Sequence, residues 1–103
     1  KLQITGPVSQ VCNTDPIDKK FESFGWAVQR VDGHDLDALI KLFDALPFTP
    51  GKPSLIIADT VKGKGVSYME NNTKWHHGVP DAKQYEDALS ELENTGATIP
   101  DDF

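Results

Sequence analysis

The sequence has little cysteine, little basic charge and no long apolar run. Its single cysteine, Cys12, excludes an intramolecular disulfide and a metal site built from several thiolates, and it suits a reducing, cytoplasmic compartment. The 10 Lys and Arg residues stand against 16 Asp and Glu residues, and the net charge of −6 argues against a nucleic-acid or anionic-membrane surface. No apolar stretch approaches the length of a membrane span or a signal peptide. We therefore expect a cytoplasmic protein without a nucleic-acid or membrane partner.

Several well-known catalytic and nucleotide-binding motifs are also absent. The P-loop pattern GxxxxGK[ST], the dinucleotide fingerprint, the zinc motif HExxH and the serine elbow GxSxG do not occur. Cys12 lies in an expected loop without a basic neighbour to lower its pKa, so we assign it no nucleophilic role. We interpret the carboxylate pairs Asp35 with Asp37 and Glu91 with Glu93 as helix caps or surface residues, not as an acid/base pair.

The beginning of the sequence suggests the continuation of a longer chain. It starts at Lys1 without an initiator methionine, and the only methionine is Met69. The first residues, "KLQITG", resemble the end of a strand that runs into a turn at Gly6. We therefore expect residues 1–103 to be a single fragment of a larger protein, with its upstream part missing.

Three apolar segments predict strands: "LQI", "WAVQRVD" and "SLIIADTV". The last is a continuous apolar run, which is typical of a strand buried on both faces of a parallel sheet. Because strands and helices alternate, the predicted fold class is α/β, a partial parallel sheet with flanking helices and right-handed crossovers. Three strands are few for such a sheet, so we expect an unpaired edge that further strands complete.

Apolar residues at helical spacing predict three helices. We expect Asp15 to cap the first helix with Pro16 at its first position, and Asp35 to cap the second. The third helix is "DAKQYEDALSELE", and the tail "NTGATIPDDF" has no regular pattern. The residues expected to face inward are Ile17, Phe21 and Phe24 in the first helix, Leu36, Leu39, Ile40, Phe43 and Leu46 in the second, and Ala82, Tyr85, Leu89 and Leu92 in the third.

Two polar segments follow predicted strands, "DGHD" and "TVKGKGVSYMENNTKWHHGVPD". Ligands of parallel sheets bind at the carboxyl ends of the strands, so both segments are site candidates. The glycines of "KGKG" would let backbone N–H groups and a lysine approach a phosphate, although a solvated lysine turn has the same pattern.

The side chains of these two segments differ in whether they suggest a functional or a structural role. One of the adjacent His76 and His77 could serve a cleft as a hydrogen-bond donor or acid/base, and neither has a partner that would indicate zinc. We interpret His34 as a turn residue, Trp75 as a packing residue and Glu70 as a solvated charge. From the residues alone, the chain has a phosphate-friendly sheet edge without a complete active site.

The succession "KFESFGW", "VQRVDGHD", "KPSLIIADTVKGKGVSYMEN" and "WHHGVP" closely resembles the thiamine-diphosphate-binding half of transketolases. The similarity is to the later part of that half, as in transketolase N-terminal subunits, and it covers residues 1 to about 92. It implies the C-terminal portion of a thiamine-diphosphate-binding domain. The implied reaction is transfer of a two-carbon ketol unit between sugar phosphates, a step of carbohydrate metabolism in the pentose phosphate pathway.

The resemblance also implies roles for particular residues. The backbone carbonyl of Leu2 would complete a metal shell, Ile4 would lie near the cofactor ring, and Lys62 would lie near the diphosphate. The motif HG-x-P makes His77 the histidine that contacts the diphosphate and the donor substrate, and hence the expected catalytic and cofactor-binding residue. Because an extra histidine stands between Trp and His77 here, His76 remains the alternative.

The implied cofactors are thiamine diphosphate and Mg²⁺ or Ca²⁺. The family's GDG metal motif is absent from this chain, and the metal-binding Asn would precede Lys1. The implied partners are a pyrimidine-binding domain or C-terminal subunit, in a homodimer or heterotetramer, so we expect the chain alone to be inactive. The alternatives are a piece of a related thiamine enzyme such as 1-deoxyxylulose-5-phosphate synthase, or a non-catalytic binding or assembly module.

Overall fold

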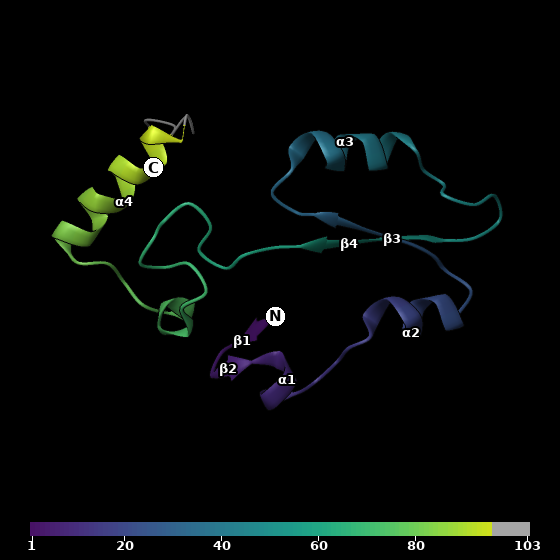
Figure 1. Cartoon of the computed structure of the whole chain (residues 1–103), viewed down its shortest axis with the longest axis horizontal. Helices are drawn as coiled ribbons and strands as arrows, with labels where there is room; N and C mark the ends of the chain where they lie inside the picture. Colours follow the sequence, from purple (N-terminus) through teal and green to yellow (C-terminus); the bar gives the residue numbers. More distant parts are fainter. Residues whose placement is uncertain (96–103) are drawn as a thin grey trace. The chain divides into compact units, whose positions relative to one another are not determined.

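The computed structural model describes residues 1–95, which fall in two compact units (Figure 1). The first, which we call the strand unit, comprises Val8–Thr60. The second, which we call the cavity unit, joins Lys1–Pro7 to the segment that begins at Val61. The two units are described separately below. The irregular structure expected for the tail from residue 96 lies outside the described residues.

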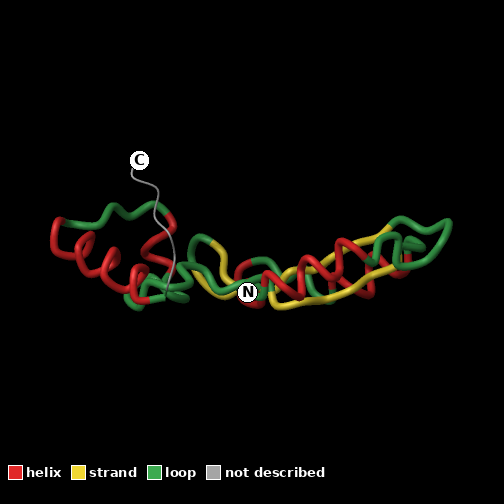
Figure 2. Tube along the Cα trace, turned by 90° about the horizontal axis from the view of Figure 1, so that it is seen from above, coloured by secondary structure: helices red, strands yellow, loops and turns green. Residues whose placement is uncertain are grey.

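The strand unit is built on two parallel strands with helices on both faces. Strand β3 (Ala27–Asp32) pairs with β4 (Ser54–Asp59), with Ala27 opposite Ser54 and Asp32 opposite Asp59. Helix α3 (Leu36–Asp44) connects them, and α2 (Ile17–Ser23) lies on the opposite face of the sheet, as Figure 1 shows; Figure 2 shows the two strands side by side. The short helix α1 (Val8–Val11) precedes α2. The prediction of an α/β fold with a partial parallel sheet and flanking helices is confirmed.

The turn at the carboxyl end of β3 has the expected compact form. The backbone N–H of Gly33 donates to the carbonyl of Asp59 at 2.7 Å, and the N–H of His34 donates to the Asp32 carboxylate at 2.9 Å. The Asp35 side chain accepts from the N–H of Ala38 at 2.9 Å, which confirms it as the cap of α3. The carboxyl ends of β3 and β4 are therefore adjacent, as the sequence predicts for a parallel pair.

The prediction that Asp15 caps the first helix is wrong. Pro16 occupies the N-cap position of α2 with extended backbone, no side chain caps the helix, and the first helical residue is Ile17. Asp15 thus lies one position before the N-cap residue, because the helix begins one residue later than the sequence predicts. Its own backbone N–H donates instead to the Asn13 side chain at 3.0 Å.

The cavity unit contains a short hairpin, a 3₁₀ turn and a long helix. Strand β1 (Leu2–Gln3) pairs antiparallel with β2 (Gly6–Pro7), because the chain reverses in the two residues between them. The expectation that "LQI" belongs to the parallel sheet is therefore wrong. The turn η1 (Thr73–His76) leads to α4 (Ala82–Asn94), whose first turn is closed by a capping box between Asp81 and Gln84.

Burial in both units is shallow. Among the described residues, Val66 is the buried hydrophobic side chain, at 7% exposure. Strand β4 is half-buried from Ser54 to Ile57 and exposed at Ala58 and Asp59, so the prediction of a strand buried on both faces is wrong. Within residues 1–95, β3 is the one strand paired with it, which leaves its other edge open. Ala38, Leu39 and Leu42 of α3 are half-buried, whereas the second apolar row of that helix is exposed, as is Leu46 just beyond its end: Leu36, Ile40, Phe43 and Leu46. Of these, only Leu39 agrees with the prediction for α3.

The inward-facing residues predicted for the other helices are confirmed in part. Ile17 and Phe21 of α2 are half-buried, but Phe24 is 75% exposed. On α4, Leu89 and Leu92 are half-buried, whereas Ala82 and Tyr85 are exposed. No helix within residues 1–95 combines the length and apolar character needed to cross a lipid bilayer.

Candidate functional site

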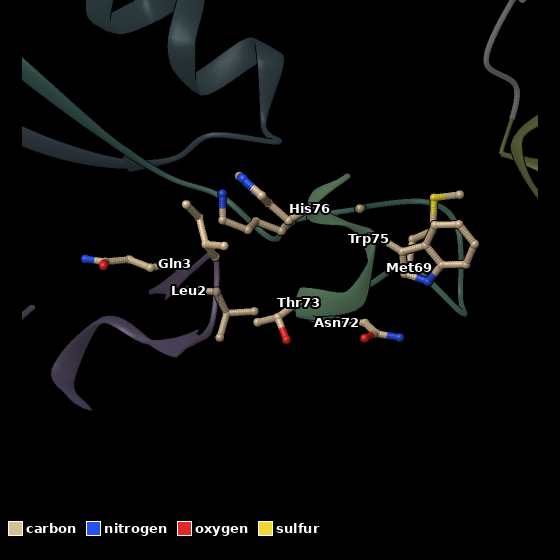
Figure 3. Close-up of a pocket in the computed structure, with 10 residues that line it drawn as sticks. Leu2, Gln3, Met69, Asn72, Thr73, Trp75 and His76 are labelled. Carbon is tan, nitrogen blue, oxygen red and sulfur yellow. The ribbon is translucent and has the colours of Figure 1, made fainter. Parts of the chain in front are cut away.

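A cavity of about 650 Å³ lies in the cavity unit. Figure 3 shows Leu2, Thr73 and His76 arranged around this space. Its wall combines the β1 hairpin, the loop after β4 and the turn η1. The lining residues are Leu2, Gln3, Ile4, Lys62, Gly63, Met69, Asn72, Thr73, Trp75 and His76.

The cavity brings together three of the four residues that the resemblance singles out. Leu2, Ile4 and Lys62 all line it, although Leu2 and Lys62 are 60 positions apart in the sequence. The histidine on its wall is His76, and His77 is not among the lining residues. The rings of the two histidines contact each other edge to face, with their centroids 5.4 Å apart and their planes at 76°.

The loop after β4 is folded back tightly at Gly63. Gly63 has a φ of +74°, and an added Cβ would lie 2.6 Å from the backbone of Met69. The N–H of Asn71 donates to the carbonyl of Lys62 at 2.9 Å, which closes the loop across its base. Glycine is needed at position 63 both for the left-handed backbone and for this close approach. The loop therefore presents Lys62 and Met69 to the same cavity.

Glu70 stabilises this loop, and the interpretation of it as a solvated charge is wrong. Its carboxylate accepts from the N–H of Gly65 at 3.1 Å and lies 3.6 Å from the ammonium of Lys64. The glutamate is half-buried, and both of these contacts are made to the "KGKG" turn, one to its main chain and one to a side chain. One of the two lysines is thus neutralised by Glu70, while Lys62 lines the cavity.

Tyr68 joins the cavity wall to α4. Its carbonyl accepts from the indole N–H of Trp75 at 3.0 Å and from the amide of Asn72 at 3.1 Å. Its hydroxyl donates to the carbonyl of Gln84 at 2.7 Å, and its ring packs against Trp75 with centroids 5.1 Å apart. Desolvation, together with the negative charges of Asp87, Glu91 and Asp81, raises the pKa of Tyr68 above its usual value. Trp75 is thus a packing residue, as predicted, and also part of the cavity wall.

The polar groups around the cavity suit an anion. The described lining residues include a lysine, a histidine, a glutamine, an asparagine and a threonine, and none is acidic. This composition contrasts with the whole chain, in which acidic residues outnumber basic ones by 16 to 10. Within the described part of the chain, the Lys62 ammonium has no carboxylate partner. The donor set therefore fits a phosphate or diphosphate group.

The same residues do not suffice for a metal site. Within residues 1–95, no three His, Cys, Asp or Glu side chains gather closely enough to hold a metal ion. The Leu2 backbone at the cavity wall could supply one carbonyl ligand, and the Gln3 and Asn72 amides line the same cavity. The carboxylate ligands typical of Mg²⁺ and Ca²⁺ would have to come from residues outside this lining.

Several residues of this unit carry no signal in the sequence. Nothing in the local pattern around Met69, Asn72 and Thr73 distinguishes these lining residues from an ordinary loop. Glu91, interpreted as a surface residue, is half-buried and accepts a hydrogen bond from the Ser67 hydroxyl at 2.6 Å. Such a contact spans 24 positions and leaves no signature in either local stretch.

The fold is that of an α/β protein with a parallel pair of strands. Its cavity has a polar lining that suits an anion, and part of that lining comes from the loop that follows β4 in the sequence. Residues 1–96 match the family described as transketolase, thiamine diphosphate binding domain, so the chain belongs to that family.

Curated relatives agree with this assignment. The chain is 44% identical over 92 residues to an apulose-4-phosphate transketolase subunit of Phocaeicola vulgatus, in an alignment that covers 89% of this chain and 33% of the relative. It is 35% identical over 97 residues to 6-deoxy-6-sulfo-D-fructose transketolase subunit SqwG of a Clostridium species, with 94% and 35% covered. It is 36% identical over 92 residues to human transketolase-like protein 2, with 89% and 14% covered. The chain thus spans about a third of the length of the bacterial relatives.

Proposed function

We propose that this chain is the later part of the diphosphate-binding domain of a transketolase. The whole enzyme would transfer a two-carbon ketol unit from a ketose phosphate to an aldose phosphate with thiamine diphosphate as cofactor. The observation that carries this proposal is the cavity wall, which Leu2, Ile4 and Lys62 line together and whose lining residues within the described part of the chain include no acidic side chain. The family match and the relatives named as transketolase subunits support it.

Each lining residue has a definite task in this proposal. The Lys62 ammonium binds and neutralises the diphosphate, and Ile4 gives the cofactor ring an apolar contact. The Leu2 carbonyl is one ligand of the Mg²⁺ or Ca²⁺ that bridges the diphosphate, with side-chain ligands from outside this chain. When bound, thiamine diphosphate supplies the carbon–carbon bond cleavage, and the protein orients the substrate and stabilises developing negative charge.

A histidine of the pair at 76 and 77 contacts the diphosphate and the donor sugar in this proposal. The family motif assigns the task to His77, whereas the cavity is lined by His76. A second domain or subunit would complete the active site, because the chain spans only about a third of its bacterial relatives. We therefore assign activity to the assembled protein and none to the chain alone.

The test uses the intact protein with its partner domain or subunit. Replacing Lys62 by alanine should weaken thiamine diphosphate binding at least about tenfold, because hydrogen bonds to a charged group contribute about 1.5–3 kcal/mol. Lys52→Ala is the matched control, because Lys52 lies in an exposed turn of the strand unit. Binding is measured by titration calorimetry and turnover by sugar-phosphate transfer. Equal affinity in the two variants, or no transfer by the wild type, would contradict the proposal.

The two histidine assignments are separated by single variants. Replacing the histidine that contacts the substrate by Asn should lower kcat about 100-fold or more. The Asn variant of the other histidine should change kcat only a few-fold. If neither variant loses activity, the histidine pair has no part in the reaction. A wild type that binds thiamine diphosphate without transferring a ketol unit would favour a binding or assembly module.

A further inference from the structure

Glu91 of α4 holds the loop that forms one wall of the cavity. Its two carboxylate oxygens accept separate hydrogen bonds from Ser67, one from the backbone N–H and one from the hydroxyl, the latter at 2.6 Å. Glu91 is half-buried at this contact. Two donors on one ionised carboxylate make a stronger and more directional contact than a single neutral hydrogen bond.

Tyr68, the residue after Ser67, connects this contact to residues that line the cavity. The Tyr68 hydroxyl donates to Gln84 of α4, and the Tyr68 carbonyl accepts from Asn72 and Trp75. Asn72 and Trp75 line the cavity, whereas Ser67 and Glu91 do not. A displacement of the Ser67 backbone would therefore move the acceptor that fixes both cavity residues.

The geometry points to Glu91 as a positioning residue for the cavity: we propose that its carboxylate fixes the Ser67–Tyr68 backbone and thereby holds Asn72 and Trp75 in place. The occupant of the cavity follows from the proposed function, on which this part of the inference rests. Glu91 touches no ligand itself and acts only through Ser67 and Tyr68.

A role limited to the stability of α4 fits the contacts less well. The helix already has its own capping box between Asp81 and Gln84 and an i,i+4 ion pair between Lys83 and Asp87 at 2.7 Å. The Glu91 oxygens are directed to the loop, and both accept from the same residue. The contact therefore organises the loop more than the helix.

The experiment replaces Glu91 by alanine in the intact protein, with Glu93→Ala as the matched control. Glu93 lies two positions further along α4 and is exposed. We expect Glu91→Ala to raise the dissociation constant of thiamine diphosphate about tenfold, as when a hydrogen bond supporting a binding residue is removed, with kcat at saturating cofactor nearly unchanged. Glu91→Gln should recover most of the affinity, because its oxygen still accepts from the Ser67 N–H. The control should leave the constant unchanged.

A second readout does not depend on the cofactor. Amide hydrogen exchange across residues 66–75 of the ligand-free protein should accelerate in Glu91→Ala and not in Glu93→Ala. Faster exchange with no thiamine diphosphate binding in the wild type would leave the positioning role intact and reject only the proposed function. Identical exchange and affinity in the two alanine variants would overturn the inference. If Glu91→Ala does not fold, Ser67→Ala removes one of the two hydrogen bonds and should shift both readouts in the same direction.

Discussion

At the scale of single residues, the cavity depends on a glycine that no other residue can replace without strain. Gly63 combines a φ of +74° with a backbone neighbour that an added Cβ would meet at 2.6 Å. Gly51 has a φ of +78°, but an added Cβ would meet nothing within 4 Å. Substitution at Gly51 therefore tests the strain of a left-handed backbone alone. Substitution at Gly63 adds the steric clash between the new Cβ and the Met69 backbone.

We predict that Gly63→Ala lowers the free energy of unfolding of the intact protein by about 3 kcal/mol or more, whereas Gly51→Ala lowers it by about 1–2 kcal/mol. The larger loss arises because the Met69 backbone must move away from the new methyl group. Urea unfolding of both variants beside the wild type measures the difference. Equal losses would show that the loop relaxes freely around position 63.

At the scale of elements, Tyr68 ties the cavity loop to α4 through a bond that high pH should break. Desolvation and the nearby acidic residues raise its pKa above the usual value of 10.0, so the folded state binds the phenolic proton more tightly than the unfolded state does. The resulting stability is fully present below about pH 10 and is lost as the pH rises through the raised folded pKa.

We therefore predict that the intact protein loses stability more steeply between pH 9 and 11 (about one pH unit on either side of the ordinary tyrosine pKa) than its Tyr68→Phe variant does. The phenylalanine variant should be less stable at neutral pH, because it lacks the hydrogen bond to Gln84. Thermal unfolding at a series of pH values gives both curves. Parallel curves would mean that Tyr68 titrates as it would in the unfolded chain.

Elements with a strong local pattern were predictable from the sequence. The periodicity of α3 and α4 and the apolar runs of β3 and β4 gave these elements and their order, and Asp35 gave the start of α3. The cap at Asp15 and the pairing of β1 were not predictable in the same way. Both depend on the exact residue at which the chain turns. A shift of that turn by one residue gives the helix a different cap or the strand a different partner.

The candidate site was predictable only as far as the family motif extends. Leu2, Ile4 and Lys62 came from the resemblance, and the structure places them on one cavity. The link from Glu91 through Ser67 was not predictable, because a contact between positions 24 apart has no local pattern. Such supporting contacts depend on tertiary packing and not on composition.

At the scale of the whole molecule, the described residues bury little apolar surface. Exposed fractions of 75% for Phe24, 71% for Leu36 and 59% for Phe43 leave large apolar side chains in water. Val66 is the buried hydrophobic residue within residues 1–95. A protein is stable by only about 5–15 kcal/mol, and most of the opposing conformational entropy must be balanced by apolar burial. The exposed row on α3 is therefore a surface that a stable protein would cover.

We predict that the isolated 103-residue chain unfolds without a cooperative thermal transition and shows no saturable binding of thiamine diphosphate with Mg²⁺. The reasons are the shallow burial of residues 1–95 and the absence, among those residues, of a His, Cys, Asp or Glu cluster that could hold the metal. Part of the binding free energy would then be used to order the loop. Circular dichroism during heating and titration calorimetry test the two parts, with the intact protein as the control. A sharp transition together with saturable micromolar binding would show that residues 1–103 form an autonomous cofactor-binding domain, and that the cavity needs no support from outside the chain.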